Sequence, residues 1–348
     1  IRGNIPRCVA GTAGNGYVRG RGTDARPTMS DETTRRTDGS GHEDGRFSDV
    51  PDDGGIAGFD PSFVDVDGRR TRYYDVGSGQ PLVLIHGGAW GGTSSANTWS
   101  TVLDRLGDRF RVLAFDRIGC GMTDNPEDSA DYRYGSEIEH GLGFIEAIGV
   151  EEAHLCGASR GAGLAACLAV EAPDLVETLV LSNSHTFGPP AGNFEHRYER
   201  LFERFEGSLE ATDPEYTRFR YGQYCHRTDH VTDEFCTANA YMASRRKARE
   251  TAEVLSEHED RFEATKEARI RETHERIRDG ELTVPTLYVF GRDDLTVPLG
   301  TATAAFDLLG QETPNVRLHL LNDCGHLPYR EYPAEFARTV TDFVDRWH

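Results

Sequence analysis

From residue 70 onward, short apolar segments alternate with longer segments of helical periodicity. Residues Arg70–Val76 alternate polar and apolar side chains, which is typical of an antiparallel edge strand. Six short apolar runs predict buried parallel strands: Leu82–Ile85, Val112–Phe115, His154–Cys156, Thr178–Leu181, Leu287–Phe290 and Val316–Leu321. Helical spacing recurs in Ile138–Ile148, Leu164–Val170 and Pro333–Trp347. This alternation predicts the α/β class, with a doubly wound, mostly parallel sheet.

The interval between Ser182 and Pro285 breaks this rhythm, because it contains no convincing strand. Four of its apolar residues have helical spacing: Tyr198, Leu201, Phe202 and Phe205. We therefore expect a helical cap over residues 186–282, inserted between the two parts of the core, residues 59–185 and 283–348. An insertion at the carboxyl edge of a parallel sheet lies where such folds bind their ligands.

Residues 1–58 are rich in Gly, Asp, Arg, Ser and Thr and lack apolar periodicity, which predicts a disordered tail. The first 28 residues carry five Arg and one Asp, and they lack the apolar core of a signal peptide. We interpret Met29 as the biological start, so that residues 1–28 are not native. The alternative is a genuine basic arm, and N-terminal sequencing of natively expressed protein would separate the two.

Acidic residues outnumber basic ones by 58 to 38, which gives a formal net charge of −20. Such a surface repels phosphate backbones and anionic lipids, so we expect neither nucleic acid nor membrane as a partner. Lys247 and Lys266 are the only lysines. We favour adaptation to high salt over the alternative, a GC-rich genome that replaces Lys by Arg. Equal thermal stability in low and in molar salt would contradict the salt hypothesis.

Seven cysteines are scattered along the chain without any CxxC spacing, which favours reduced thiols and a cytoplasmic protein. No stretch reaches 18 apolar residues free of charge, so no transmembrane helix is expected. The sequence leaves the oligomeric state open, and a homo-oligomer is one of the alternatives.

The segment Gly157-Ala158-Ser159-Arg160-Gly161 matches the G-x-S-x-G nucleophile elbow. Such a match is weak alone, but this one lies between the predicted strand His154–Cys156 and a predicted helix. A strand-turn-helix of this kind exposes a serine at a strained backbone position and opens a helix beside it. We therefore predict Ser159 as a nucleophile.

A serine hydroxyl needs a base, and in this fold the order along the chain is serine, acid, histidine. Asp293 and Asp294 follow the predicted strand Leu287–Phe290, and His326 follows Val316–Leu321. Neutral His326 would take the proton of Ser159, while one acid fixes the tautomer of the imidazole. This chemistry acts on a small-molecule substrate, and we expect no cofactor.

The loop from His86 to Gly92 is glycine-rich and follows the first buried strand. We expect the N–H groups of Gly88 and Arg160 to form the oxyanion hole, whereas the alternative is a merely flexible turn. Asp116 is interpreted as a structural turn residue. The cap contains Cys225, His226, His230 and Cys236, but their spacing fits no usual zinc pattern, so we predict no metal.

These residues resemble the α/β-hydrolase superfamily over about residues 70–348. The chain is most similar to the meta-cleavage-product hydrolases, which cut a carbon–carbon bond in 2-hydroxy-6-oxo-hexadienoates formed by aromatic ring opening. Four stretches carry this closer resemblance: His86–Gly92 with Asn97 and Trp99, Phe115–Gly121, Gly291–Pro298 and Cys324–His326. The resemblance implies that the acid is Asp294 rather than Asp293 and that Asn97 is the substrate-binding asparagine of the loop.

The chain departs from that family at several positions. Ala158 and Arg160 stand where the family has Asn and Met, and Leu327 stands where it has Trp after the histidine. Asn239 aligns with the cap arginine that binds the substrate carboxylate in that family. Arg245 or Arg246 is the alternative for this role, although the spacing differs. The expected substrate contacts are Asn97, Asn239 and Leu327.

The sequence thus predicts a serine hydrolase that forms an acyl-enzyme on carbonyl substrates of the meta-cleavage type. Hydrolysis of a carboxylic ester or lactone is the alternative reaction, because it needs the same triad without a carboxylate-binding arginine. A ligand-binding protein without catalysis is the alternative of another class. Epoxide and haloalkane hydrolases are less favoured, because they resemble this fold but use an aspartate where this chain has Ser159.

Overall fold

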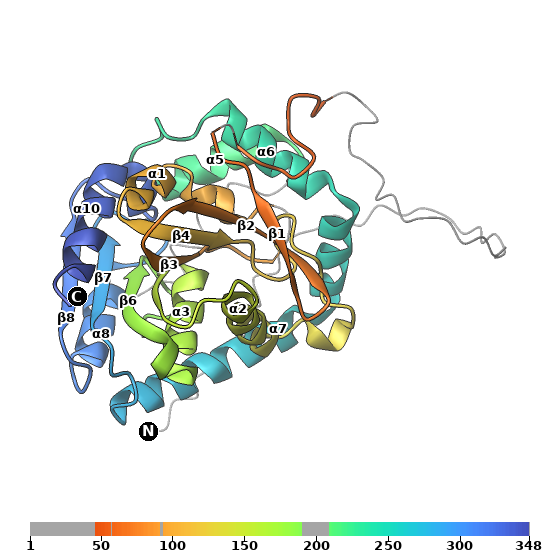
Figure 1. Cartoon of the computed structure of the whole chain (residues 1–348). Helices are drawn as coiled ribbons and strands as arrows, with labels where there is room; N and C mark the ends of the chain where they lie inside the picture. The colour runs from red at the N-terminus through yellow and green to blue at the C-terminus, as the bar shows by residue number, and fades with distance from the viewer. Residues whose placement is uncertain (1–45, 57, 91–92, 190–208, 348) are drawn as a thin grey trace, which may run out of the picture.

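A computed structural model of the chain describes residues 46–56, 58–90, 93–189 and 209–347. Its strands form one eight-stranded sheet in the order β1-β2-β4-β3-β5-β6-β7-β8 (Figure 1). The strands are β1 (Ser62–Val66), β2 (Arg69–Gly77), β3 (Gln80–Ile85), β4 (Phe110–Phe115), β5 (Ala153–Ala158), β6 (Val176–Ser182), β7 (Thr286–Gly291) and β8 (Val316–Leu321). The pairs β1–β2 and β2–β4 are antiparallel and the other pairs are parallel. The predicted doubly wound sheet is confirmed, and β1 is an additional strand.

Helices cover both faces of the sheet, because alternate side chains of each strand point to opposite sides. Val83 and Ile85 of β3 face a cluster that includes α2 (Tyr134–Ala147), α3 (Arg160–Glu171) and α8 (Leu299–Leu309). Leu82 and Leu84 of the same strand face α1 (Leu103–Gly107) and α10 (Pro333–Val344). The short helices are η1 (Ala96–Trp99), η2 (Ser129–Asp131), η3 (Pro173–Leu175) and α9 (Pro328–Glu331).

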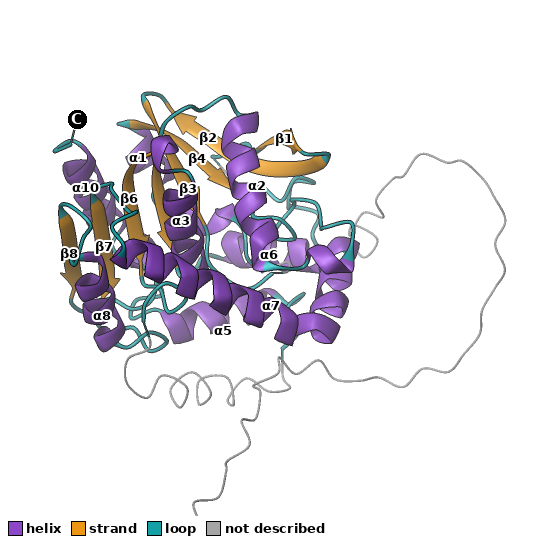
Figure 2. Ribbon diagram, turned by 90° about the horizontal axis from the view of Figure 1, so that it is seen from below, coloured by secondary structure: helices purple, strands orange, loops and turns teal. Residues whose placement is uncertain are grey.

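Three described helices fill the interval between β6 and β7, as the sequence predicts: α5 (Pro214–Tyr224), α6 (Asp233–Ser244) and α7 (Arg246–Arg278). Helix α5 begins with Asp213 as N-cap and Pro214 in its first turn, and Thr232 caps α6. In Figure 2, α5 and α7 run along the lower margin of the sheet. Helix α7 also packs through Phe262, Ile270 and Ile277 into the core cluster of α2 and α3. The residues 198–205, for which a helix is expected, lie outside the described residues.

The segment 46–56 differs from the expected disordered tail, because it packs against α6. Phe47, Val50 and Ile56 are buried in a cluster with apolar residues of that helix. The rings of Phe47 and Tyr241 lie 5.6 Å apart in an edge-to-face arrangement. The segment is anchored because these three apolar side chains find a partner surface far along the chain.

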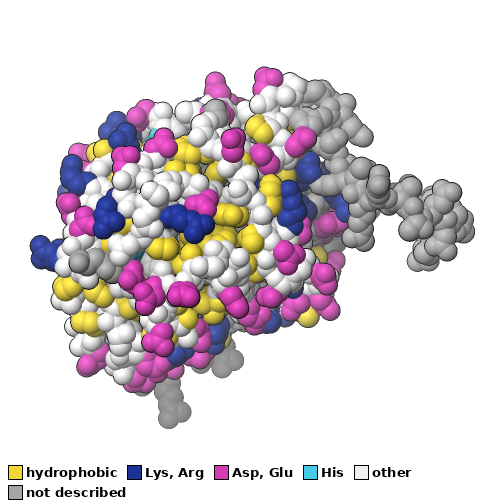
Figure 3. All heavy atoms as spheres, in the orientation of Figure 1, with side chains coloured by type: hydrophobic (Ala, Val, Ile, Leu, Met, Phe, Trp, Pro, Cys, Tyr) yellow, Lys and Arg dark blue, Asp and Glu magenta, His cyan; other side chains and the backbone are white. Residues whose placement is uncertain are grey.

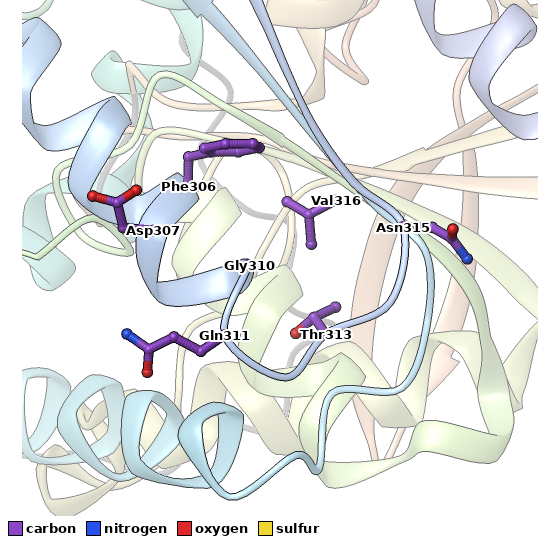
Figure 4. A pocket seen from close by; sticks show the side chains of 7 residues that line it. All are labelled: Phe306, Asp307, Gly310, Gln311, Thr313, Asn315 and Val316. Atoms are coloured by element: carbon purple, nitrogen blue, oxygen red, sulfur yellow. The ribbon is translucent and has the colours of Figure 1, made fainter.

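Charged residues of both signs are scattered over the face shown in Figure 3. A hollow at the amino end of β8 is lined by seven residues (Figure 4): Phe306, Asp307, Gly310, Gln311, Thr313, Asn315 and Val316. Strand β8 begins at Val316, so the hollow lies at the amino ends of the strands. Ligands of such folds bind at the opposite edge of the sheet, beyond the carboxyl ends of the strands. Within the described residues, no helix has the length and apolar character needed to cross a membrane.

Candidate active site

Ser159 lies in the sharp turn between β5 and α3, where the sequence predicts the nucleophile. Its backbone has φ 54° and ψ −121°, a region that costs a residue with a side chain about 1–3 kcal/mol. The turn is tight, because a Cβ on Gly157 would collide with the carbonyl oxygen of Gly161, and one on Gly161 with that of Ile85. Helix α3 starts at Arg160, so its free N–H groups lie beside the serine.

Asp294 and His326 are brought together by the loops that follow β7 and β8. The distance from His326 Nδ1 to Asp294 Oδ2 is 2.6 Å, and Asp294 is 2% exposed. Burial alone would raise the pKa of Asp294, but His326 and the hydrogen bonds from Asn183 and Thr296 hold that pKa below its ordinary value. The neighbouring Asp293 is exposed and accepts a hydrogen bond from the Asp323 N–H instead.

Asn183, which the sequence analysis did not identify, links the loops that follow three strands. Its Nδ2 donates to Asp294 Oδ2 at 2.8 Å and to Gly325 O at 3.3 Å, and its Oδ1 accepts from Gly291 N–H. Its neighbours in the same turn bond to the backbone of Ser159, since Ser159 N–H donates to Ser182 O and Ser184 Oγ donates to Ser159 O. One turn after β6 thus connects the elbow to the acid.

No described hydrogen bond joins Ser159 Oγ to His326, so their direct pairing stays a prediction. His326 is instead held by Asp294 and by α5. The backbone N–H of His326 donates to the carbonyl of Tyr224 at 2.8 Å, and the centroids of the two rings lie 5.8 Å apart. The last residue of α5 therefore lies beside the imidazole, with the two rings tilted by 55°.

The glycine loop after β3 lies against the serine. A Cβ on Gly87 would come within 2.7 Å of Ser159 Cβ, and Gly88 has φ +83°, a conformation that favours glycine. Gly88 and Arg160, the two expected oxyanion donors, thus occupy segments on either side of Ser159. Gly91 and Gly92 lie outside the described residues.

Replacing Gly87 with Ala should push the serine out of position. We expect kcat to fall by about 100-fold, because a misplacement of about 1 Å at a reacting centre has an effect of that size. Steady-state kinetics would measure the loss. Gly222→Ala is the matched control, because a Cβ there meets no atom within 4 Å, and equal losses in both variants would contradict the close contact.

The three expected substrate contacts have different surroundings. Asn97 is fully buried: its Oδ1 accepts from Arg72 and Tyr74, and its Nδ2 donates to Gly54 O. Both polar atoms are used within the protein, which favours a structural role. Asn239 on α6 is 1% exposed, and neither atom of its amide has a partner in the described part of the chain. Leu327 is buried in the cluster beside α10.

Asn97→Ala should lower the free energy of unfolding by about 1–3 kcal/mol, because it leaves buried donors and an acceptor unpaired. Urea unfolding would measure this loss. Asn322→Ala is the control, since Asn322 is exposed and pairs with Arg292 at the surface. We expect the control to change stability by less than about 0.5 kcal/mol, and a similar change for Asn97→Ala would contradict the structural role.

The described residues contain no group of three or more His, Cys, Asp or Glu placed to hold a metal. Among Cys225, His226, His230 and Cys236, His230 is bonded on both sides of its ring. Its Nδ1 accepts from Arg330 Nε at 3.2 Å, and its Nε2 is 2.9 Å from Arg227 O.

Residues 80–332 match the family described as the alpha/beta hydrolase fold. The chain belongs to this family. It is 30% identical over 292 residues to 2-hydroxy-6-oxo-6-(2'-aminophenyl)hexa-2,4-dienoic acid hydrolase of Metapseudomonas resinovorans, covering 82% of this chain and 90% of the relative. It is 31% identical over 287 residues to 2-hydroxymuconate semialdehyde hydrolase of a Pseudomonas species, and this match covers 80% of this chain and 91% of the relative.

Among solved structures, the chain is similar to a variant of the meta-cleavage product hydrolase CumD from Pseudomonas fluorescens. The TM-score is 0.63 at 26% identity, over 82% of this chain and 98% of that one. The resemblance to meta-cleavage-product hydrolases is therefore confirmed, and the chain is a hydrolase of the α/β-hydrolase fold.

In this α/β hydrolase, α7 brings charged groups to the residue that follows Ser159. Arg160 Nη2 lies 3.3 Å from Glu263 Oε1, and Lys266 Nζ contacts the other carboxylate oxygen. Burial would raise the pKa of Glu263, but the two cations hold it below its ordinary value. Two partly buried cations thus share one directly bonded carboxylate beside the elbow. Glu259, one turn earlier on α7, has its pKa raised by burial and by Glu263.

Proposed function

We propose that this protein is a serine hydrolase that forms an acyl-enzyme with Ser159 as nucleophile, His326 as base and Asp294 as orienting acid. The observation that carries the proposal is the 2.6 Å contact between Asp294 and His326, on loops at the same sheet edge as the strained Ser159. A base that is held in one tautomer by a buried carboxylate is what an alcohol nucleophile requires.

In the first half of the reaction, Ser159 Oγ attacks the substrate carbonyl and its proton passes to His326 Nε2. The N–H groups of Gly88 and Arg160 stabilise the negative charge on the carbonyl oxygen. The bond from the carbonyl carbon to its leaving group then breaks, and the leaving group takes the proton from His326. Water attacks the acyl-enzyme with His326 again as base, which releases the acid product and restores Ser159.

We favour carbonyl substrates of the meta-cleavage type, in which the leaving group departs from a carbon–carbon bond. The named activities of the relatives support this choice. The pair Arg160 and Lys266 supports a substrate that carries a carboxylate, because among the described residues the two cations share Glu263 as their one directly bonded anion. The amide of Asn239, for which the described part of the chain offers no partner, supports a further polar contact from α6.

We infer that α5, α6 and α7 belong to a cap, corresponding to residues 186–282, over the core of residues 59–185 and 283–348. The contact of Tyr224 with His326 and that of Glu263 with Arg160 support this role, since both join the insertion to the catalytic loops. We further propose a cytoplasmic enzyme, in line with the free and buried state of the six described cysteines.

The test is a paired assay of a ring-cleavage dienoate and p-nitrophenyl esters, with fluorophosphonate labelling of the same preparation. We expect turnover of the dienoate and a phosphonyl adduct on Ser159. Turnover of esters alone would replace the carbon–carbon assignment by ester or lactone hydrolysis. The absence of an adduct on Ser159 would contradict the serine mechanism and favour a binding protein.

A further inference from the structure

Arg117 lies two residues beyond β4, and its buried side chain reaches the back of the glycine loop. Its Nη2 donates to the carbonyl oxygens of Gly87 at 3.2 Å and Gly88 at 2.6 Å. Its Nη1 donates to Glu137 of α2 at 2.6 Å, and both side chains of this ion pair are fully buried. The guanidinium thus holds two consecutive peptides of the loop from one side.

His86 adds a second donor to the same carbonyl. The backbone N–H of Arg117 donates to His86 Nε2 at 3.1 Å, so the ring proton is on Nδ1, which lies 2.8 Å from Gly87 O. Burial and the nearby Arg117 lower the pKa of His86 well below its ordinary value, so the ring stays neutral in this tautomer. The Gly87 carbonyl therefore accepts from both His86 and Arg117.

These contacts act on the expected oxyanion donor through the peptide bond itself. The carbonyl of Gly87 and the N–H of Gly88 belong to one planar trans peptide, so they point in opposite directions. With the oxygen held by Arg117 and His86, the orientation of the Gly88 N–H is fixed as well. Gly87 lies against Ser159, and a hydrogen-bonded cation on a carbonyl also polarises the N–H of its peptide.

We propose that Arg117 is a positioning residue for the oxyanion hole, which orients and polarises the Gly87–Gly88 peptide, and that Glu137 holds Arg117 in place. The inference rests on the proposed serine mechanism. Glu137 also accepts from the indole N–H of Trp90, so the loop is attached to α2 at a second point, beyond the glycines. A hydrogen bond to the back of the peptide strengthens as charge develops on its front, because the two dipoles polarise each other.

A second buried pair provides the comparison that separates positioning from mere stability. Arg72 Nη1 and Asp116 Oδ2 are 3.1 Å apart and equally inaccessible to solvent, but Arg72 donates to Gly54, Tyr74, Asp116 and Asn97 rather than to the glycine loop. Removal of either pair takes one fully buried ion pair out of the protein. Only removal of Arg117 takes a donor from the Gly87 carbonyl, which then keeps His86 alone.

The experiment compares two double variants, Arg117→Met with Glu137→Gln and Arg72→Met with Asp116→Asn, so that neither leaves an unpaired buried charge. The readout is the second-order rate constant of fluorophosphonate labelling, in which Ser159 Oγ bonds to phosphorus and fluoride leaves. The phosphoryl oxygen then occupies the oxyanion hole. Loss of one direct donor costs about 10²–10³ in rate, so we expect about a 10- to 100-fold decrease for the Arg117 pair.

We expect the Arg72 pair to label at close to the wild-type rate per folded molecule, measured by active-site titration against circular dichroism. Steady-state assays of the Arg117 pair should show the decrease in kcat with KM changed less than about threefold. Arg117→Lys, which keeps a cationic donor, should recover part of the rate. Equal labelling rates in both double variants would overturn the inference, whereas failure of the wild type to label would overturn the serine mechanism instead.

Discussion

Replacing Ser159 with Ala should lower turnover by about 10⁴- to 10⁶-fold and leave the fold intact. The size follows from the loss of the attacking oxygen, because residual activity then rests only on binding and the oxyanion donors. The change removes one oxygen from a partly buried side chain that makes no described side-chain hydrogen bond. Steady-state assays with the ring-cleavage dienoate, together with circular dichroism, would measure both outcomes.

Ser159→Gly is the informative partner of this variant. It should be equally inactive, but it should unfold at a higher denaturant concentration than Ser159→Ala. The reason is φ of 54° at this position, which costs a residue with a Cβ about 1–3 kcal/mol and glycine much less. Turnover at the wild-type rate by Ser159→Ala would refute the role of Ser159 as nucleophile. Equal stability of the two variants would refute only the backbone strain at this position.

Asp294→Asn should lower kcat by about 10⁴-fold, the size expected when the base loses the acid that fixes its tautomer. In the native site, Asp294 accepts at one oxygen from Thr296 and Val297 and at the other from Asn183 and His326. An amide at this position presents an N–H to one of these groups of donors. The imidazole would then lose its fixed orientation, and kcat would fall with a much smaller change in KM.

Asp293→Asn is the matched control, since the two acids are adjacent and only one contacts the histidine. Asp293 is exposed and bonds to the Asp323 backbone, so we expect kcat to stay within about threefold of the wild type. A larger decrease in kcat for Asp293→Asn than for Asp294→Asn would show that Asp293, not Asp294, is the acid.

The sequence predicted the strands of the sheet centre well, because their apolar runs are buried on both faces. Strand β1 was missed, since only Val66 of its five residues is buried and an edge strand has little hydrophobic pattern. The interval between β6 and β7 was predicted as helical, but the single 33-residue helix α7 was not foreseen. Because most of its residues are charged, the few apolar positions that enter the core, such as Phe262 and Ile277, form no clear helical pattern in the sequence.

Candidate site residues could be predicted where they belong to a sequence motif. They could not be predicted where only their contacts in the folded chain distinguish them. Ser159, Asp294 and His326 each follow a recognisable strand, and the family resemblance distinguishes Asp294 from the adjacent Asp293. Asn183 also lies just after a predicted strand, but a single asparagine has no pattern that reveals its bonds to the segments that follow two other strands. For Asn97, the family resemblance suggested a substrate contact, yet the network with Arg72 depends on side chains that only the fold brings together.

The anchoring of segment 46–56 on α6 has a consequence for synthesis of the chain on the ribosome. Phe47 leaves the ribosome almost 190 residues before α6, its partner, begins. At about 5–20 residues per second, its apolar surface waits roughly 10–40 seconds for that helix. Polar residues surround Phe47, Val50 and Ile56, so we expect the nascent segment to stay hydrated during this delay and not to associate prematurely.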